Sequence, residues 1–159
     1  MTPAEQRQLA GIQAELGRVA RYDDESVVND KWVRQRYDCG CFASFAPARK
    51  AAVRAAWHES GHAVAALALG ARFSSASIHH GCRGEGRVHG VSGASATAFV
   101  IDAAGQIGER FGDDGCAAWR YSEQVLTPLR LTIRQVARAM LVHPRHLPYA
   151  VVAALADAA

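Results

Sequence analysis

The sequence predicts a mostly helical α+β domain that carries one short β-hairpin. Three observations favour this class: a long helical pattern at residues 48–69, two short strand-like segments directly after it, and further helical patterns on both sides. The chain has 159 residues, of which 50% are hydrophobic and 21% are charged. This composition supplies one hydrophobic core and excludes two large domains and extensive disorder.

The first helix is predicted over residues 2–20. Thr2 is placed to cap it, Pro3 takes its first position, and Glu5 stands at capping-box spacing. The apolar stripe that should pack on one side consists of Leu9, Ile12, Leu16 and Val19. A mixed charged and aromatic stretch follows, which we interpret as a connecting arm.

The pattern at residues 48–69 is the strongest helix in the chain, and Gly70 is placed as its C-cap. Its apolar residues cover nearly the whole circumference, so we expect it in the interior, where a polar side chain must be paired or bound. The predicted strands are residues 74–78 and 86–91, and the further predicted helices are residues 97–111, 119–142 and 146–158. Pro128 should kink or split the second of these helices.

The composition also indicates which binding partners and which cellular compartment to expect. With 18 Lys and Arg against 15 Asp and Glu and no basic run, the sequence predicts no nucleic-acid binding. No segment reaches the roughly 20 apolar residues that cross a bilayer, and the first residues do not resemble a signal peptide. We therefore expect a cytoplasmic protein with no membrane span. Four irregularly spaced cysteines favour reduced thiols over a disulfide framework: Cys39, Cys41, Cys82 and Cys116.

The buried helix contains the pattern HExxH, formed by His58, Glu59 and His62. In a chain of this composition the pattern would occur by chance about 0.01 times. Residues four apart share one face of a helix, so the two imidazoles can converge on one zinc ion. Glu59 can reach a water without being a ligand, take its proton and pass the proton to a leaving amine. The pattern predicts a zinc metalloendopeptidase, a hydrolase of peptide bonds.

Two other interpretations stay open. The first is a catalytically silent module with the metalloprotease fold, which binds or regulates a partner and uses zinc for stability. In the second the motif is accidental, and His58 and His62 are core histidines with hydrogen-bonded ring nitrogens. Three ionisable groups among the Ala, Leu and Val residues of this helix are costly unless they share a purpose, which favours zinc.

Residues 56–66, AWHESGHAVAA, resemble the HEAGHAVVA helix of the peptidase domain of the FtsH family, the ATP-dependent zinc metalloproteases. Residues 76–90 are similar to the strand and glycine turn that follow in that family, residues 103–109 to its AGRAAEE helix, and residues 136–141 to its LARxMV segment. The resemblance spans about residues 51–141. It implies an FtsH-like peptidase fold for the main domain, residues 51–159, and leaves residues 1–50 as a helical N-terminal extension or arm.

The resemblance also implies a third zinc ligand, a carboxylate downstream of Gly105. The acidic residue nearest to the family's position is Glu123, and Asp113 and Asp114 are rivals. The sequence has no GxxxxGK[ST] loop, so we expect a peptidase that works without an ATPase module of its own. Its partners would then be a protein or peptide substrate and, in addition, a second copy of the chain or a separate partner protein.

Three further features near the motif lead to expectations about substrate binding and catalysis. The strand at residues 74–78 would offer an edge to which an extended peptide substrate pairs. Histidines of the predicted hairpin either stabilise an oxyanion or lie on the surface: His79, His80 and His89. Glu109 could orient a zinc-bound imidazole by accepting its second N–H.

Overall fold

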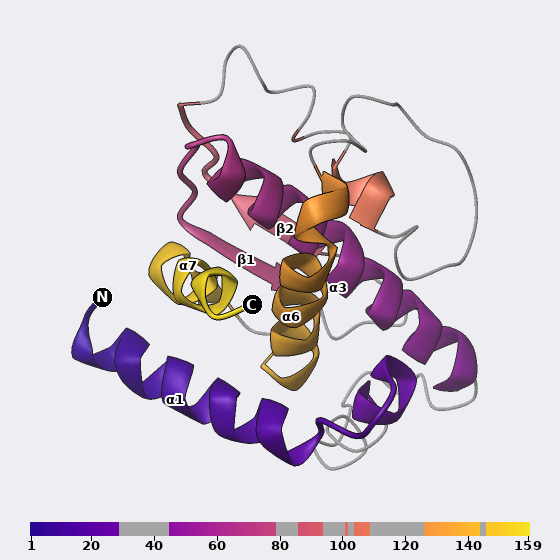
Figure 1. The fold of residues 1–159 in the computed structure, drawn as a ribbon. Coiled ribbons are helices and arrows are strands. Elements are labelled where there is room, and N and C mark those ends of the chain that lie inside the picture. The colour runs from indigo at the N-terminus through magenta and orange to yellow at the C-terminus, as the bar shows by residue number, and fades with distance from the viewer. Residues whose placement is uncertain (29–44, 79–85, 94–100, 102–103, 109–125, 144–145) are drawn as a thin grey trace.

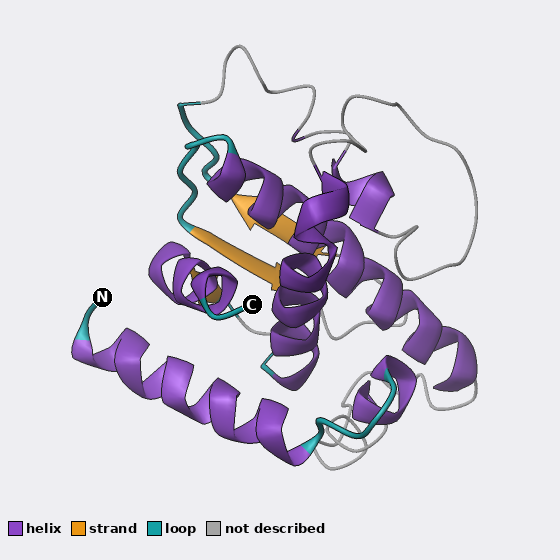
Figure 2. Ribbon diagram, viewed as in Figure 1, coloured by secondary structure: helices purple, strands orange, loops and turns teal. Residues whose placement is uncertain are grey.

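The computed structural model describes residues 1–28, 45–78, 86–93, 101, 104–108, 126–143 and 146–159. Its longest helix, α3 (Phe45–Ala68), packs against α6 (Arg130–Val142) and against strands β1 (Ser75–Ile78) and β2 (Gly86–His89). Figure 1 shows α3 running behind α6 and past the small sheet. Figure 2 shows that helices make up more of the described chain than strands do. The coarse prediction of a mostly helical α+β fold is therefore confirmed.

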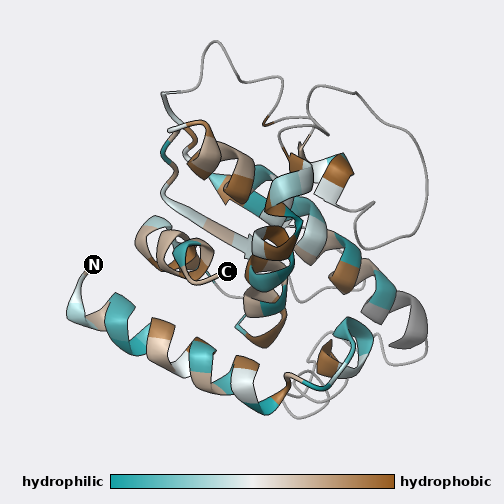
Figure 3. Cartoon of the chain, viewed as in Figure 1, coloured by the Kyte–Doolittle hydropathy of each residue, from teal (hydrophilic) through white to brown (hydrophobic). Residues whose placement is uncertain are grey.

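Helix α1 (Pro3–Arg18) begins where the sequence predicts, with Thr2 as its N-cap. The Thr2 hydroxyl accepts a hydrogen bond of 3.3 Å from the Glu5 N–H, and the Glu5 carboxylate accepts one of 2.5 Å from the Thr2 N–H. Ile12 is buried, and the helix packs against α6 and α7 (Tyr149–Asp157). Figure 3 shows hydrophilic and hydrophobic residues alternating along α1, as expected of a helix that buries one side.

Helix α3 ends in the glycine cap that the sequence predicts. Gly70 has a φ of 71°, which favours glycine because it has no Cβ. Its N–H donates to the carbonyl of Leu67 at 3.1 Å, and the N–H of Ala71 donates to that of Ala66 at 2.8 Å. These two bonds form a Schellman motif, which satisfies carbonyls at the helix end.

The predicted hairpin pairs as expected, but the sheet has a third strand. β1 is antiparallel to β2 from Ser75 to Ile78, and on its other side it pairs with β3 (Leu147–Pro148). The strand order is β2-β1-β3, which makes β1 the central strand. The prediction that this strand offers an edge to a peptide is wrong at Ser75 and Ala76, because these two residues pair with β3.

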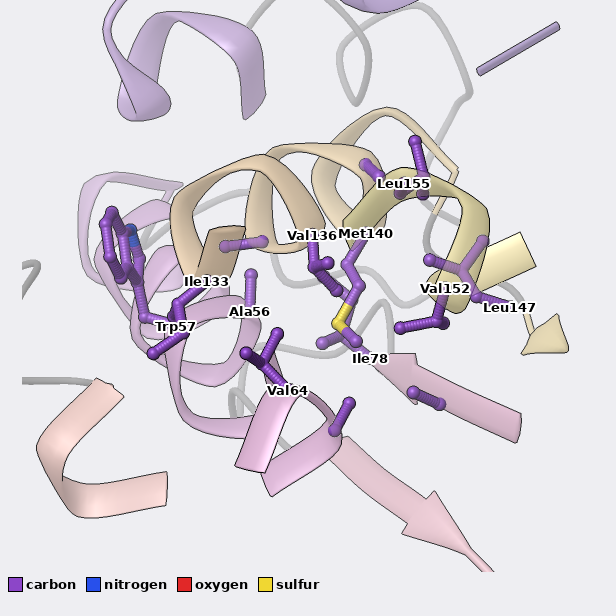
Figure 4. Close-up of a cluster of buried hydrophobic side chains, with 14 of the residues drawn as sticks. Ala56, Trp57, Val64, Ile78, Ile133, Val136, Met140, Leu147, Val152 and Leu155 are labelled. Atoms are coloured by element: carbon purple, nitrogen blue, oxygen red, sulfur yellow. The ribbon is translucent and has the colours of Figure 1, made fainter. Parts of the chain in front are cut away.

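The core lies between α3, α6, α7 and the sheet, as Figure 4 shows. Side chains from all of these elements meet there, among them Val64, Ile78, Met140, Leu147 and Val152. Pro128 lies in the 3-10 helix η2 (Thr127–Leu129), between the helical residue Leu126 and α6. Residues 119–125 of the predicted helix lie outside the described ranges. Within the described ranges, no helix is both long enough and apolar enough to span a membrane.

The N-terminal residues are joined to this core by a polar network. Two nitrogens of Arg138 on α6 donate to the carbonyls of Val19 and Tyr22 at 2.6 and 3.0 Å. The same guanidinium lies 3.5 Å from the carboxylate of Asp24, which accepts a hydrogen bond of 2.9 Å from the indole of Trp57. Residues 19–24 are therefore fixed to both α3 and α6. The division of the chain at residue 50 stays a prediction.

Candidate metal site

His58 and His62 lie on successive turns of α3 and turn their ring nitrogens toward each other. Their Nε2 atoms are 3.0 Å apart, and their rings meet edge to face with centroids 4.7 Å apart. Two nitrogens bound to one tetrahedral zinc at about 2.0–2.1 Å stand about 3.3 Å from each other. The pair is therefore close to the separation that a shared metal ion requires.

The second nitrogen of His62 has a fixed partner. Its Nδ1 lies 2.5 Å from the backbone carbonyl oxygen of Ile101. A carbonyl only accepts hydrogen bonds, so Nδ1 carries the proton and donates it to Ile101. Histidines that bind metals usually donate their other N–H to a carbonyl or carboxylate in this way. Sequence reasoning missed Ile101 because any residue type supplies a backbone carbonyl.

Gly105 packs its backbone against both imidazoles. A Cβ at this position would lie 2.5 Å from the Nε2 of His58 and would overlap the Nε2 of His62. Residues 104–108 are helical, as predicted for residues 97–111, and the remaining residues of that prediction except Ile101 lie outside the described ranges. The sequence offered a signal for Gly105, because it stands in the segment that resembles the AGRAAEE helix.

Glu59 is 7% exposed and lies beneath the first residue of β2. A Cβ on Gly86 would overlap the Cγ of Glu59 and lie 3.0 Å from its Cδ. The same Cβ would be 3.0 Å from the carbonyl oxygen of Ser77 on β1. The Glu59 side chain is thus enclosed between α3 and the sheet, and Glu59 directly follows His58, the first histidine of the motif.

Comparisons of the chain with protein-family models, curated proteins and solved structures found no match. The likeness to the FtsH family therefore stays a prediction that depends on the motifs in residues 56–141.

Most of the predicted site residues outside α3 lie in parts of the chain that the structure does not describe. Glu123, Asp113 and Asp114 lie outside the described residues, as do Glu109, His79, His80 and all four cysteines. Among the described residues no three His, Cys, Asp or Glu side chains gather into a possible metal site. His89 is half-buried on β2, where its Nε2 lies 3.4 Å from the Ser77 hydroxyl and its ring lies 6.5 Å from that of His146. The structure thus brings together His58 and His62, with Glu59 between them in sequence.

Proposed function

We propose that this chain is a zinc-dependent metallopeptidase that needs no ATPase module of its own. The observation that carries the proposal is the convergence of the two Nε2 atoms at 3.0 Å while the Nδ1 of His62 is held by Ile101. Packing alone does not require two imidazoles to face each other through the nitrogens that ligate metals.

The donor set fits zinc. Imidazole nitrogens suit this ion, and two of them with one carboxylate leave a coordination position for substrate or water. We assign His58 and His62 as two ligands and Glu123 as the third, with Asp113 and Asp114 as its alternatives. When bound, the ion would supply Lewis acidity, which polarises the scissile carbonyl and lowers the pKa of water.

Glu59 supplies the proton chemistry in this proposal. Its carboxylate takes a proton from the attacking water and returns it to the leaving amine as the peptide C–N bond breaks. Its burial beneath Gly86 holds it in place and keeps bulk water from competing for its oxygens. A general base must be positioned before its pKa matters, and the enclosure between α3 and β2 provides that positioning.

The same burial gives some support to a second candidate, a catalytically silent module in which zinc is structural. A base that must meet a substrate is usually reachable, whereas Glu59 is 7% exposed. The two candidates share the metal site and differ only in whether Glu59 acts. They are therefore separated by an experiment on this residue.

The first measurement is zinc per chain in purified, dialysed protein, for the native sequence and for Glu123→Ala. We expect about one zinc natively and clearly less in the variant. If the native protein takes up no zinc even after incubation with the ion, the metallopeptidase proposal fails. If Glu123→Ala retains its zinc, the third ligand is Asp113, Asp114 or another group.

Peptide cleavage is then compared for the native protein, Glu59→Gln and Glu15→Gln. Glu15 lies on α1 and pairs with Arg18 at 3.0 Å, so its conversion to Gln is a matched control away from the site. We expect Glu59→Gln to keep zinc and lose cleavage, and Glu15→Gln to keep both. Equal cleavage by all three proteins would exclude Glu59 as the base. Zinc binding without cleavage in the native protein would favour the silent module.

A further inference from the structure

We propose that Ile101 and the segment of residues 104–108, which lie outside the HExxH helix, fix the orientation of His62 and the separation of the two zinc-binding imidazoles. This inference rests on the proposed metallopeptidase function. It assigns positioning roles to Ile101 and Gly105, neither of which is a ligand.

Ile101 fixes the orientation of His62 through its backbone carbonyl. A carbonyl only accepts hydrogen bonds, so the Nδ1 of His62 carries a proton and donates to it. The Nε2 of the same ring then faces the Nε2 of His58, 3.0 Å away, and is the nitrogen that would bind a metal ion.

Gly105 sets how closely the two rings approach. Its backbone faces the Nε2 atoms of both rings, and a Cβ would also lie 2.7 Å from the Cε1 of His62. Real Cβ atoms are not found at such distances, so a side chain here must push the imidazoles away or move the segment. The imidazole tips can rotate, so the protein can fold with alanine here, but the rings then lose the geometry that a metal needs.

Two other glycines explain why this segment lies so close to α3. A Cβ on Gly61 would overlap the carbonyl oxygen of Ala104, and one on Gly108 would overlap that of Trp57. Both neighbours are backbone atoms, which cannot rotate away as imidazoles can. We infer that Gly61 and Gly108 allow the segment to dock and that Gly105 determines what it does to the histidines.

The test measures zinc affinity by competition with a chromophoric chelator, for the native protein, Gly105→Ala and Gly11→Ala. Gly11 is a matched control because it is a helical glycine on α1 with no atom within 4 Å of an added Cβ. We expect Gly105→Ala to weaken zinc binding roughly 10- to 100-fold, the range found when groups that support metal ligands are changed. Gly11→Ala should bind zinc as the native protein does. Equal affinity of Gly105→Ala and the native protein would overturn the role of Gly105.

A second measurement uses the native protein and does not depend on any variant folding. Nitrogen-15 NMR of the imidazoles should show His62 as the Nδ1–H form, as the contact with Ile101 requires. His62 as the Nε2–H form would overturn the role of Ile101. If the native protein bound no zinc but His62 were still the Nδ1–H form, the proposed function would fail and the role of Ile101 would stand.

Discussion

The indole Nε1 of Trp57 donates a hydrogen bond of 2.9 Å to the carboxylate of Asp24. Trp57 directly precedes His58, so this bond joins the N-terminal residues to the turn of α3 that carries the candidate metal site. Trp57 is 4% exposed, and the side chains of Asp24 and Arg138 are 15% and 11% exposed. The N-terminal residues thus bind to α3 at the residue that precedes His58.

Replacing Asp24 with Ala should destabilise the protein by about 1–3 kcal/mol, because it leaves the indole N–H without its acceptor and Arg138 without its carboxylate. Asp24→Asn should cost less, since its amide oxygen can still accept from Trp57. Urea unfolding measures both changes, with Asp157→Ala at the exposed end of α7 as a control expected to stay within about 0.5 kcal/mol. Equal stability of Asp24→Ala and the native protein would show that the network is dispensable.

Gly86→Ala should act on Glu59 without touching a zinc ligand. The new methyl group would overlap the Glu59 side chain, so we expect a loss of about 1–3 kcal/mol in stability from overpacking. Cleavage of a peptide should fall while zinc per chain stays unchanged, because Glu59 is displaced and the imidazoles are not. Gly17→Ala, which meets no atom within 4 Å on α1, is the matched control. Native cleavage by Gly86→Ala would contradict the enclosure of Glu59 beneath β2.

Ser60→Ala should be nearly neutral although Ser60 lies inside the HExxH motif. The buried Ser60 hydroxyl has Met140 as a hydrogen-bond acceptor, with its oxygen 3.6 Å from the sulfur, and a thioether is a weak acceptor. Alanine also favours a helix by about 0.5 kcal/mol relative to serine. We expect unfolding free energy, zinc content and cleavage all to stay close to native. A loss of zinc in this variant would point to a role for the hydroxyl that its contact with Met140 does not explain.

The capping box of α1 should make its contribution to stability depend on pH. Hydrogen bonds from the backbone N–H and the hydroxyl of Thr2 hold the pKa of Glu5 below its usual value of 4.5. A depressed pKa means that the stabilisation is fully present above the unfolded value and is lost as the pH falls through the lower, folded value. Unfolding measured from pH 7 to pH 3 should therefore show a difference between the native protein and Glu5→Gln that shrinks below about pH 4.5. A difference that stayed constant over this range would exclude a charged capping box.

Much of the fold follows from local patterns that the sequence displays. The capping box at Thr2, the glycine cap after α3 and the pairing of β1 with β2 are all visible as residue types at fixed spacing. Strand β3 is different, because two residues, Leu147 and Pro148, carry no periodicity. Its pairing with β1 is a tertiary contact, and it occupies the edge predicted for peptide binding at Ser75 and Ala76.

The geometry of the candidate site is also only partly visible in the sequence. The sequence by itself determined that His58 and His62 share a face of a buried helix with Glu59 between them, because the helical repeat brings residues four apart together. Only the tertiary structure decided which carbonyl fixes His62, that Gly105 lies against both rings, and that Gly86 covers Glu59. These contacts join segments that are distant in the chain, and they are made by a backbone carbonyl and by glycines, which have no side chain. Every residue type has a backbone carbonyl, and a glycine shows its purpose only when its neighbour in space is known.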